Sequence, residues 1–233
     1  MAERLFRASS RRQGRAESGD QVLVVGLGRF GGGVAEELIS LGFEVLGVDG
    51  DAGRVQSLAD ELTHVVQADT TTEEALRQLG AADFRIAVVG IGTDIEASIL
   101  TTAALADIGV PNIWAKAVTA PHGRILERVG AHHVVFPEQE MGQRVAHLVG
   151  RRIIDWFQLD PEFAMVETEA PAELIGRSLS EVGLRGRYGV TVVCIKPVGQ
   201  GFTYATADSV IAEGDVLVVA GPTEAAEAFA QMA

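Results

Sequence analysis

The sequence predicts an α/β protein in which a doubly wound parallel sheet is followed by a small C-terminal α+β lobe. Short apolar runs alternate with amphipathic stretches from Gln21 to about residue 137. This alternation is typical of a parallel sheet that helices cover on both faces. A glycine turn joins the first apolar run to the first amphipathic stretch. After Pro137 the alternation stops, which indicates a second, differently built region.

The first region, residues 21–137, contains enough elements for a complete Rossmann-like domain. We expect strands at 22–25, 44–48, 64–67, 86–89, 112–115 and 133–136. We expect helices near 31–41, 52–61, 72–79, 94–108 and 120–129. Glycines at 42, 109 and 130 stand where helices should end, and Thr72 with Glu73 and Glu74 resembles a helix start.

The segment 138–160 is predicted to be a crossover region made of helices. Its stretch 138–157 reads as helical with an interruption near Gly150, and it carries the apolar residues Ile153, Ile154, Trp156 and Phe157. A helix of this kind that leaves a finished domain would expose a large apolar patch unless a partner covers it. The sequence therefore predicts a homo-oligomer built from dimers.

Residues 161–233 are predicted to form the small C-terminal lobe. Strands are expected at 163–168, 189–196 and 215–220, followed by a helix near 223–231. The single cysteine, Cys194, lies in an apolar run, which favours a buried structural thiol. A chain with one cysteine has no internal disulfide, and this suits a reducing, cytoplasmic compartment.

Composition excludes several classes of function. The chain of 233 residues is 47% hydrophobic and carries a net charge of −13, which argues against nucleic acid as the main ligand. No apolar run is long enough to span a membrane. Residues 1–20 contain five arginines and are predicted to be a disordered basic tail, either solvated or in contact with acidic lipid or a partner.

The glycine turn is the strongest indication of a ligand. The stretch Gly26-Leu27-Gly28-Arg29-Phe30-Gly31 follows a strand and opens a helix. In such a turn, Gly26 permits the tight bend, Gly28 lets the backbone approach phosphates and Gly31 allows close packing of helix on strand. The N-terminus of the helix then offers free N–H groups to an anion. We interpret the turn as a nucleotide site.

Further candidates follow from the rule that ligands bind beyond the carboxyl ends of parallel strands. Asp49 ends the second strand and is placed to accept the ribose hydroxyls, with Asp51 as the less favoured alternative. A carboxylate there disfavours the 2′-phosphate of NADP. The candidates at the ends of the later strands are Asp69, Thr70, Gly90 to Gly92, Lys116 and Glu138. Lys116 reads equally well as a phosphate ligand or as an ordinary exposed lysine.

No catalytic constellation is visible in the sequence. His132 and His133 are adjacent at the start of a strand, so their side chains diverge and do not form a pair. The HxxxH, CxxC, GxSxG and GxxxxGK[ST] patterns are missing. The sequence therefore predicts a nucleotide-binding protein that is not an enzyme.

Several stretches together resemble one family. The glycine turn, Glu44 to Asp49, Pro111 to Ala117 and Phe136 to Gly142 are similar to the RCK (regulator of potassium conductance, or KTN) domain. Leu184 to Val190 and Glu213 to Val219 resemble the C-terminal lobe of that family. The chain is most similar to the cytosolic regulatory subunits of Ktr/Trk-type potassium uptake systems.

This resemblance implies properties that the residues alone do not show. Such subunits form dimers that assemble into an octameric ring beneath a membrane-embedded cation translocator, at the inner face of the cell membrane. They bind ATP or ADP, and some bind NAD(H). The basic tail and a proline-free loop at 202–207 depart from the family pattern. The alternative function is an NAD(H)-binding redox sensor or an NAD-dependent oxidoreductase.

Three side-chain roles complete the expectation. Arg29 is predicted to meet a terminal phosphate, and the resemblance supports a contact across the dimer, with Phe30 as packing. Glu138, alone or with the same residue of a second copy, is predicted to help hold Mg²⁺ or Ca²⁺ beside the γ-phosphate, because a lone carboxylate would repel a triphosphate. In the C-terminal lobe, Arg185, Arg187 and Tyr188 form a possible second site for a cyclic diadenylate such as cyclic di-AMP, or are merely solvated turn residues.

Overall fold

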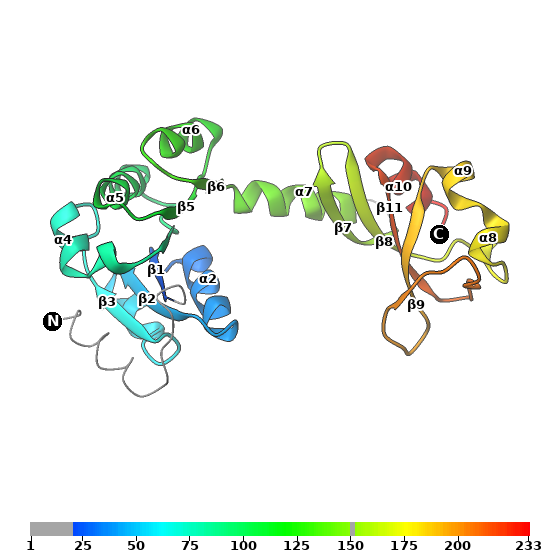
Figure 1. Ribbon diagram of the computed structural model, residues 1–233, viewed down its shortest axis with the longest axis horizontal. Helices are drawn as coiled ribbons and strands as arrows, with labels where there is room; N and C mark the ends of the chain where they lie inside the picture. Colours follow the sequence, from blue (N-terminus) through cyan, green and yellow to red (C-terminus); the bar gives the residue numbers. More distant parts are fainter. Residues whose placement is uncertain (1–20, 150–151) are drawn as a thin grey trace. The chain divides into compact units, whose positions relative to one another are not determined.

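A computed structural model describes residues 21–149 and 152–233 of the chain, in two units (Figure 1). The N-terminal unit extends to Glu138 and the C-terminal unit begins at Gln139. The predicted basic tail, residues 1–20, and the predicted helix break near Gly150 lie outside the described residues.

The N-terminal unit is the predicted doubly wound α/β domain. Its sheet is parallel throughout, with the strand order β3-β2-β1-β4-β5-β6. The strands are β1 (Gln21–Val25), β2 (Glu44–Asp49), β3 (His64–Gln67), β4 (Ile86–Val89), β5 (Asn112–Lys116) and β6 (His133–Val135). The helices are α2 (Arg29–Ser40), α3 (Ala52–Ser57), α4 (Glu73–Gln78), the 3₁₀ turn η1 (Ala81–Asp83), α5 (Ile95–Ile108) and α6 (Ala120–Arg128).

Alternation along the strands divides the core of this unit into two clusters. In β1, Leu23 and Val25 belong to the larger cluster, whereas Val22 and Val24 belong to the other. All four side chains are buried, as expected for a strand covered on both faces. The sheet reverses its strand order between β1 and β4, and the carboxyl ends of these two strands therefore flank the expected ligand crevice.

The C-terminal unit is built around a five-stranded sheet with the order β10-β9-β11-β8-β7, all of its pairs antiparallel. Its strands are β7 (Ile153–Asp160), β8 (Phe163–Glu169), β9 (Thr191–Lys196), β10 (Thr203–Tyr204) and β11 (Val216–Pro222). Its helices are α7 (Pro137–Val149, beginning in the N-terminal unit), the 3₁₀ turn η2 (Ala172–Leu174), α8 (Leu179–Val182), α9 (Leu184–Tyr188) and α10 (Thr223–Ala230).

One predicted element is wrong. Residues 153–160 form the strand β7, not the second half of a crossover helix, and β7 pairs with β8. Ile153 and Trp156 lie in the core of the C-terminal unit, while Ile154 and Phe157 stay about half exposed. The misreading has a physical cause, because a short apolar run rich in β-branched and aromatic residues has no periodicity that separates strand from helix. Cys194 on β9 is partly exposed, so the expectation of a buried thiol was too strong.

Candidate functional site

Three glycines bring the backbones of two turns into contact at the carboxyl ends of β1 and β4. Gly26 has a φ of +88°, in the left-handed region that glycine tolerates. A Cβ on Gly31 would lie 1.9 Å from the carbonyl oxygen of Gly26, and one on Gly90 would lie 2.8 Å from the same oxygen. Side chains at these positions would therefore force the turns apart.

The second glycine of the motif has the opposite surroundings. A Cβ on Gly28 would meet nothing within 4 Å, so the turn is open at this point. Gly28 is also the N-cap of α2, and it has no side chain to cap the N–H groups of the first turn. An open glycine beside an uncapped helix N-terminus is the arrangement that accepts a phosphate. The residues present thus fit a dinucleotide or nucleoside phosphate.

Asp49 at the end of β2 is buried, and its carboxylate already holds the glycine turn. Oδ2 accepts a hydrogen bond from the backbone N–H of Leu27 at 2.7 Å, and Oδ1 accepts one from the N–H of Asp51 at 2.8 Å. Arg54 on α3 adds a longer contact of 3.3 Å to Oδ2. Asp49 is thus fixed at the crevice with acceptor capacity left on Oδ1, which suits a ribose hydroxyl.

Other side chains next to Asp49 have local structural roles. The side chain of Asp51 caps α3 by accepting from the N–H of Arg54, which agrees with its lower rank as a ribose ligand. Arg54 was missed in the sequence, although a basic residue five positions after Asp49 was a visible signal.

The residues after β3 divide into an exposed and a buried member. Asp69 is exposed and accepts hydrogen bonds from the N–H and the hydroxyl of Thr71, which hold the pKa of its carboxyl below the usual value. Thr70 is buried, and its hydroxyl lies 3.1 Å from that of Thr101 on α5. Thr70 therefore attaches the loop after β3 to α5, whereas the carboxylate of Asp69 is exposed to solvent.

The structure brings Lys116 and Glu138 into an ion pair. Nζ of Lys116 lies 2.5 Å from Oε1 of Glu138, and the exposed fractions of the two side chains are 11% and 65%. The Lys116 ammonium, with a smaller contribution from Arg29, holds the pKa of the Glu138 carboxyl below its usual value. The alternative that Lys116 is an ordinary exposed lysine is wrong, since its side chain is buried.

Two residues of the glycine turns complete the surroundings of this ammonium. Nζ lies 5.7 Å from the centre of the Phe30 ring, a cation–π distance. A Cβ on Gly92 would stand 3.0 Å from Nζ, so a residue larger than glycine would crowd the lysine. Phe30 thus packs beside the charge, while Arg29, the first residue of α2, is exposed at the same end of the sheet.

The predicted metal ligand does not form a cation site by itself. Within residues 21–149 and 152–233, no group of three or more His, Cys, Asp or Glu side chains is arranged to hold a metal ion. The Glu138 oxygen is bound to an ammonium, which is the wrong neighbour for Mg²⁺ or Ca²⁺. The described side chains therefore do not hold a metal on their own, and the role of Glu138 beside a nucleotide phosphate stays a prediction.

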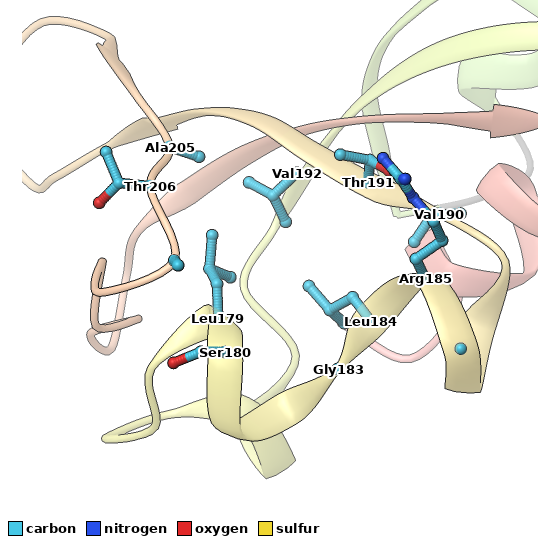
Figure 2. A pocket seen from close by; sticks show the side chains of 12 residues that line it. Leu179, Ser180, Gly183, Leu184, Arg185, Val190, Thr191, Val192, Ala205 and Thr206 are labelled. Carbon is cyan, nitrogen blue, oxygen red and sulfur yellow. The ribbon is translucent and has the colours of Figure 1, made fainter.

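A second candidate site is a pocket of about 470 Å³ in the C-terminal unit (Figure 2). Its lining comes from α8, α9, β9 and the loop after β10, and includes Leu179, Leu184, Arg185, Thr191 and Val192. Nε of Arg185 donates a hydrogen bond to the hydroxyl of Thr191 at 3.1 Å. The pocket thus combines an apolar floor with one cationic group at its edge.

Only one of the three residues predicted for this second site lines the pocket. Arg185 does, but Arg187 and Tyr188 do not. The guanidinium of Arg187 lies over the Tyr188 ring at 5.4 Å, and the Tyr188 hydroxyl donates to Glu173 at 2.6 Å. That bond raises the pKa of Tyr188. Arg185 and Arg187 are two positions apart on the helix α9 and so point to nearly opposite sides of it, and Tyr188 lies outside the lining of this pocket.

The adjacent histidines have the diverging directions that were expected. Nδ1 of His132 accepts the backbone N–H of Ile113, while the His133 ring stacks on Trp114 with 4.0 Å between centroids. Each therefore serves a different neighbour.

Comparisons with known proteins identify two domains. Residues 22–137 match the TrkA-N domain and residues 163–233 match the TrkA-C domain. The Ktr system potassium uptake protein A of Bacillus subtilis (strain 168) is 38% identical over 202 residues, covering 86% of this chain and 91% of the relative. The protein of the same name from Vibrio alginolyticus is 34% identical over 210 residues, covering 89% and 96%.

Solved structures share the fold. The crystal structure of the GsuK RCK domain superposes with a TM-score of 0.64 at 18% identity, over 97% of this chain and 51% of that one. The GsuK channel bound to NAD gives a TM-score of 0.63 at 18% identity, over 97% and 42%. This chain thus spans about half of those structures or less, and the likeness confirms the predicted architecture. No helix in the described ranges is long and apolar enough to cross a membrane.

Proposed function

Because this chain belongs to the family of Ktr system potassium uptake proteins A and C, we propose that it is a nucleotide-sensing regulatory subunit that gates a membrane potassium or other cation transporter. The observation that carries the proposal is the open Gly28 at the uncapped N-terminus of α2, beside the fixed carboxylate of Asp49. The relatives are named as potassium uptake proteins, which supports the prediction that this chain is not an enzyme.

The nucleotide we propose is ATP or ADP. Lys116 and Arg29 place positive charge at the same end of the sheet as the glycine turn, where terminal phosphates would lie. Binding would bring phosphate oxygens to the N–H groups of α2 and a ribose hydroxyl to Asp49. NAD(H) is the second candidate, because a structure with the same fold is described as bound to NAD. That ligand would make the subunit a redox sensor.

Discrimination of ATP from ADP is assigned to Arg29. This side chain is exposed at the first position of α2, so it is free to reach a terminal phosphate in its own subunit or in a dimer partner. Mg²⁺ or Ca²⁺ would accompany ATP only if the phosphates supply most of its oxygen ligands, with Glu138 as the protein contribution. A contact that depends on the last phosphate turns a local charge change into a change of subunit arrangement.

A homo-oligomer built from dimers, up to an octameric ring, is the proposed assembly. Met141, Val145 and Val149 recur every fourth position along α7 and are all exposed, so they form an apolar stripe. Ile154 and Phe157 on β7 add exposed apolar surface in the same unit. A second copy is the natural cover for such a stripe. Light scattering should give at least a dimer, and a monomer at micromolar concentration would contradict the proposal.

The pocket of the C-terminal unit is proposed as a second regulatory site for a cyclic diadenylate. Its volume of about 470 Å³ suits a small ligand, and Arg185 offers a bidentate phosphate contact. The apolar lining from Leu179, Leu184 and Val192 would contact a base.

The proposal is tested by identifying and then titrating the nucleotide. Chromatography of the ligand released by denaturing the purified protein should show adenosine phosphates, whereas nicotinamide dinucleotide would favour the redox sensor. Calorimetry should then show ATP binding that falls about 10- to 150-fold in Arg29→Ala, the range of one charge-assisted hydrogen bond, with little change for ADP. Arg77→Ala is the matched control, since Arg77 pairs with Glu73 on α4. Equal losses for ATP and ADP would mean that Arg29 only shapes the turn.

A further inference from the structure

The ammonium of Lys116 is a buried charge whose ion pair is made with a carboxylate at the edge of the site. Its side chain is 11% exposed, and the Phe30 ring and the Gly92 backbone lie around it. A buried ammonium is costly unless an anion accompanies it. Glu138 provides that anion at 2.5 Å.

A nucleotide phosphate bound at this edge of the sheet would be expected to pair with the same ammonium. Lys116 ends β5 at the carboxyl edge of the sheet, and Arg29 and the N-terminus of α2 lie at that edge too. A phosphate that arrives there meets a cation already neutralised by a carboxylate. Two anions cannot both pair closely with one ammonium without repelling each other.

We propose that Glu138 is a built-in competitor of the nucleotide, which occupies Lys116 in the empty protein and must be displaced from it when a phosphate binds. This inference rests on the proposed nucleotide site. It differs from the role of Glu138 as a metal ligand in its dependence on Lys116. A metal ligand without its metal would also repel a phosphate, but that repulsion would not depend on Lys116, whereas the competitor acts only through Lys116.

The position of Glu138 in the chain gives the exchange a consequence. Glu138 is the second residue of α7 and the last residue of the N-terminal unit. When phosphate takes over Lys116, the first turn of α7 loses its charged attachment to β5. Nucleotide occupancy is thereby converted into a change in how tightly the start of this helix is held.

The experiment measures ADP affinity by calorimetry on the full chain in EDTA. Glu138→Gln keeps the size of the side chain and removes its charge, so ADP should bind about 3- to 10-fold more tightly than to the wild-type protein. The factor is modest because the carboxylate is 65% exposed and solvent screens the pair. Lys116→Met should weaken ADP about 10-fold, as expected for loss of a charge-assisted contact.

Two comparisons make the test specific. In the Lys116→Met background, Glu138→Gln should bring no further gain, because the cation for which it competes is gone. Adenosine, which has no phosphate, should bind wild type and Glu138→Gln equally. Glu140→Gln, two positions along the same helix, should behave as wild type. Thermal unfolding of each variant shows whether it is folded.

The outcomes separate this inference from the proposed function. If wild type binds ADP in EDTA and Glu138→Gln binds it equally or more weakly, the proposal that Glu138 competes with the nucleotide is overturned. The proposed nucleotide site is unaffected by that result. A gain that persists in the Lys116→Met background also overturns the competitor, since the effect then does not act through Lys116. If wild type binds neither ADP, ATP nor NAD, the proposed function fails and the competitor falls with it.

Discussion

The two candidate sites of this protein are built in different ways. In the N-terminal unit, the site is made largely of backbone, where Gly26, Gly31 and Gly90 pack against one another and Gly28 stays open. In the C-terminal unit, the pocket is lined by side chains from α8, α9, β9 and a loop. A parallel sheet brings its strand ends to one edge, so its topology alone places a ligand site. An antiparallel sheet has no such edge, and its pocket depends on the side chains around it.

The cationic side chains of the two sites also differ, in their burial and in their partners. Lys116 in the N-terminal unit is buried and paired with a carboxylate, with which we propose that a phosphate competes. Arg185 in the C-terminal unit is exposed, and its Nε donates a hydrogen bond to the hydroxyl of Thr191. If the proposals hold, a ligand of the first site displaces a carboxylate from Lys116, whereas a ligand of the second site meets an arginine without an ionic partner in the described residues.

The largest expected effect tests whether the first site depends on backbone packing. Gly31→Ala places a Cβ 1.9 Å from the carbonyl oxygen of Gly26, so the turn must shift. We expect a loss of about 2–4 kcal/mol in the free energy of unfolding, at the upper end of overpacking effects, and loss of nucleotide binding. Urea unfolding followed by circular dichroism, together with calorimetry, measures both.

A matched control lies in the same helix. Gly33→Ala meets nothing within 4 Å and should stabilise α2 by about 0.5–1 kcal/mol through helix propensity. Gly186 lines the pocket of the C-terminal unit, and a Cβ there would meet nothing within 4 Å. Gly186→Ala should therefore leave the fold intact. If Gly31→Ala were as mild as these two, the contrast between a backbone site and a side-chain site would be lost.

The next effect in size tests the side-chain character of the second site. Arg185→Ala should weaken binding of a cyclic diadenylate about 10-fold, the cost of one charge-assisted phosphate contact. Arg187→Ala, on the same short helix but outside the pocket lining, should change the affinity little. Calorimetric titration of both variants provides the comparison. Equal effects of the two substitutions would show that overall charge, rather than the pocket, attracts the ligand.

The smallest expected effect concerns acid sensitivity of the N-terminal unit. His122 on α6 is buried, and this burial lowers the pKa of its imidazole below the usual value. Its Nδ1 accepts the N–H of Val118, two residues after Lys116 ends β5. The neutral form is favoured in the folded state, so the unfolded state binds more protons once the pH falls below about 6.5. The stability contributed by neutral His122 should therefore be complete above about pH 6.5 and be lost progressively as the pH falls below that value.

His122→Asn removes this titration while keeping an acceptor for the Val118 N–H. The difference in melting temperature between wild type and variant should change with pH below about 6.5 and stay constant above about pH 7. Carboxylates that titrate in both proteins cancel in this difference. A difference independent of pH would show that His122 does not contribute to the acid sensitivity.

Much of the N-terminal unit follows from the sequence pattern alone. All six expected strands are present, and the register of β1 between β2 and β4 places Gly26 and Gly90 at one edge. The positions of Asp49 and Lys116 followed from the same rule. The C-terminal unit was less predictable, because β7 is an apolar run without period and α8, α9 and β10 are too short for periodicity to identify.

The sequence by itself determined the architecture of the parallel sheet, the glycine turn and the family, because these depend on local pattern and on chain order. Only the tertiary structure decided which partner each charged side chain has. Lys116 and Glu138 are 22 positions apart. They come within 2.5 Å of each other because β5 ends, and α7 begins, at the same edge of the sheet. Arg185 and Arg187 are nearly adjacent, yet only Arg185 lines the pocket. Electrostatic energy depends on distance and burial in space, and a sequence records neither.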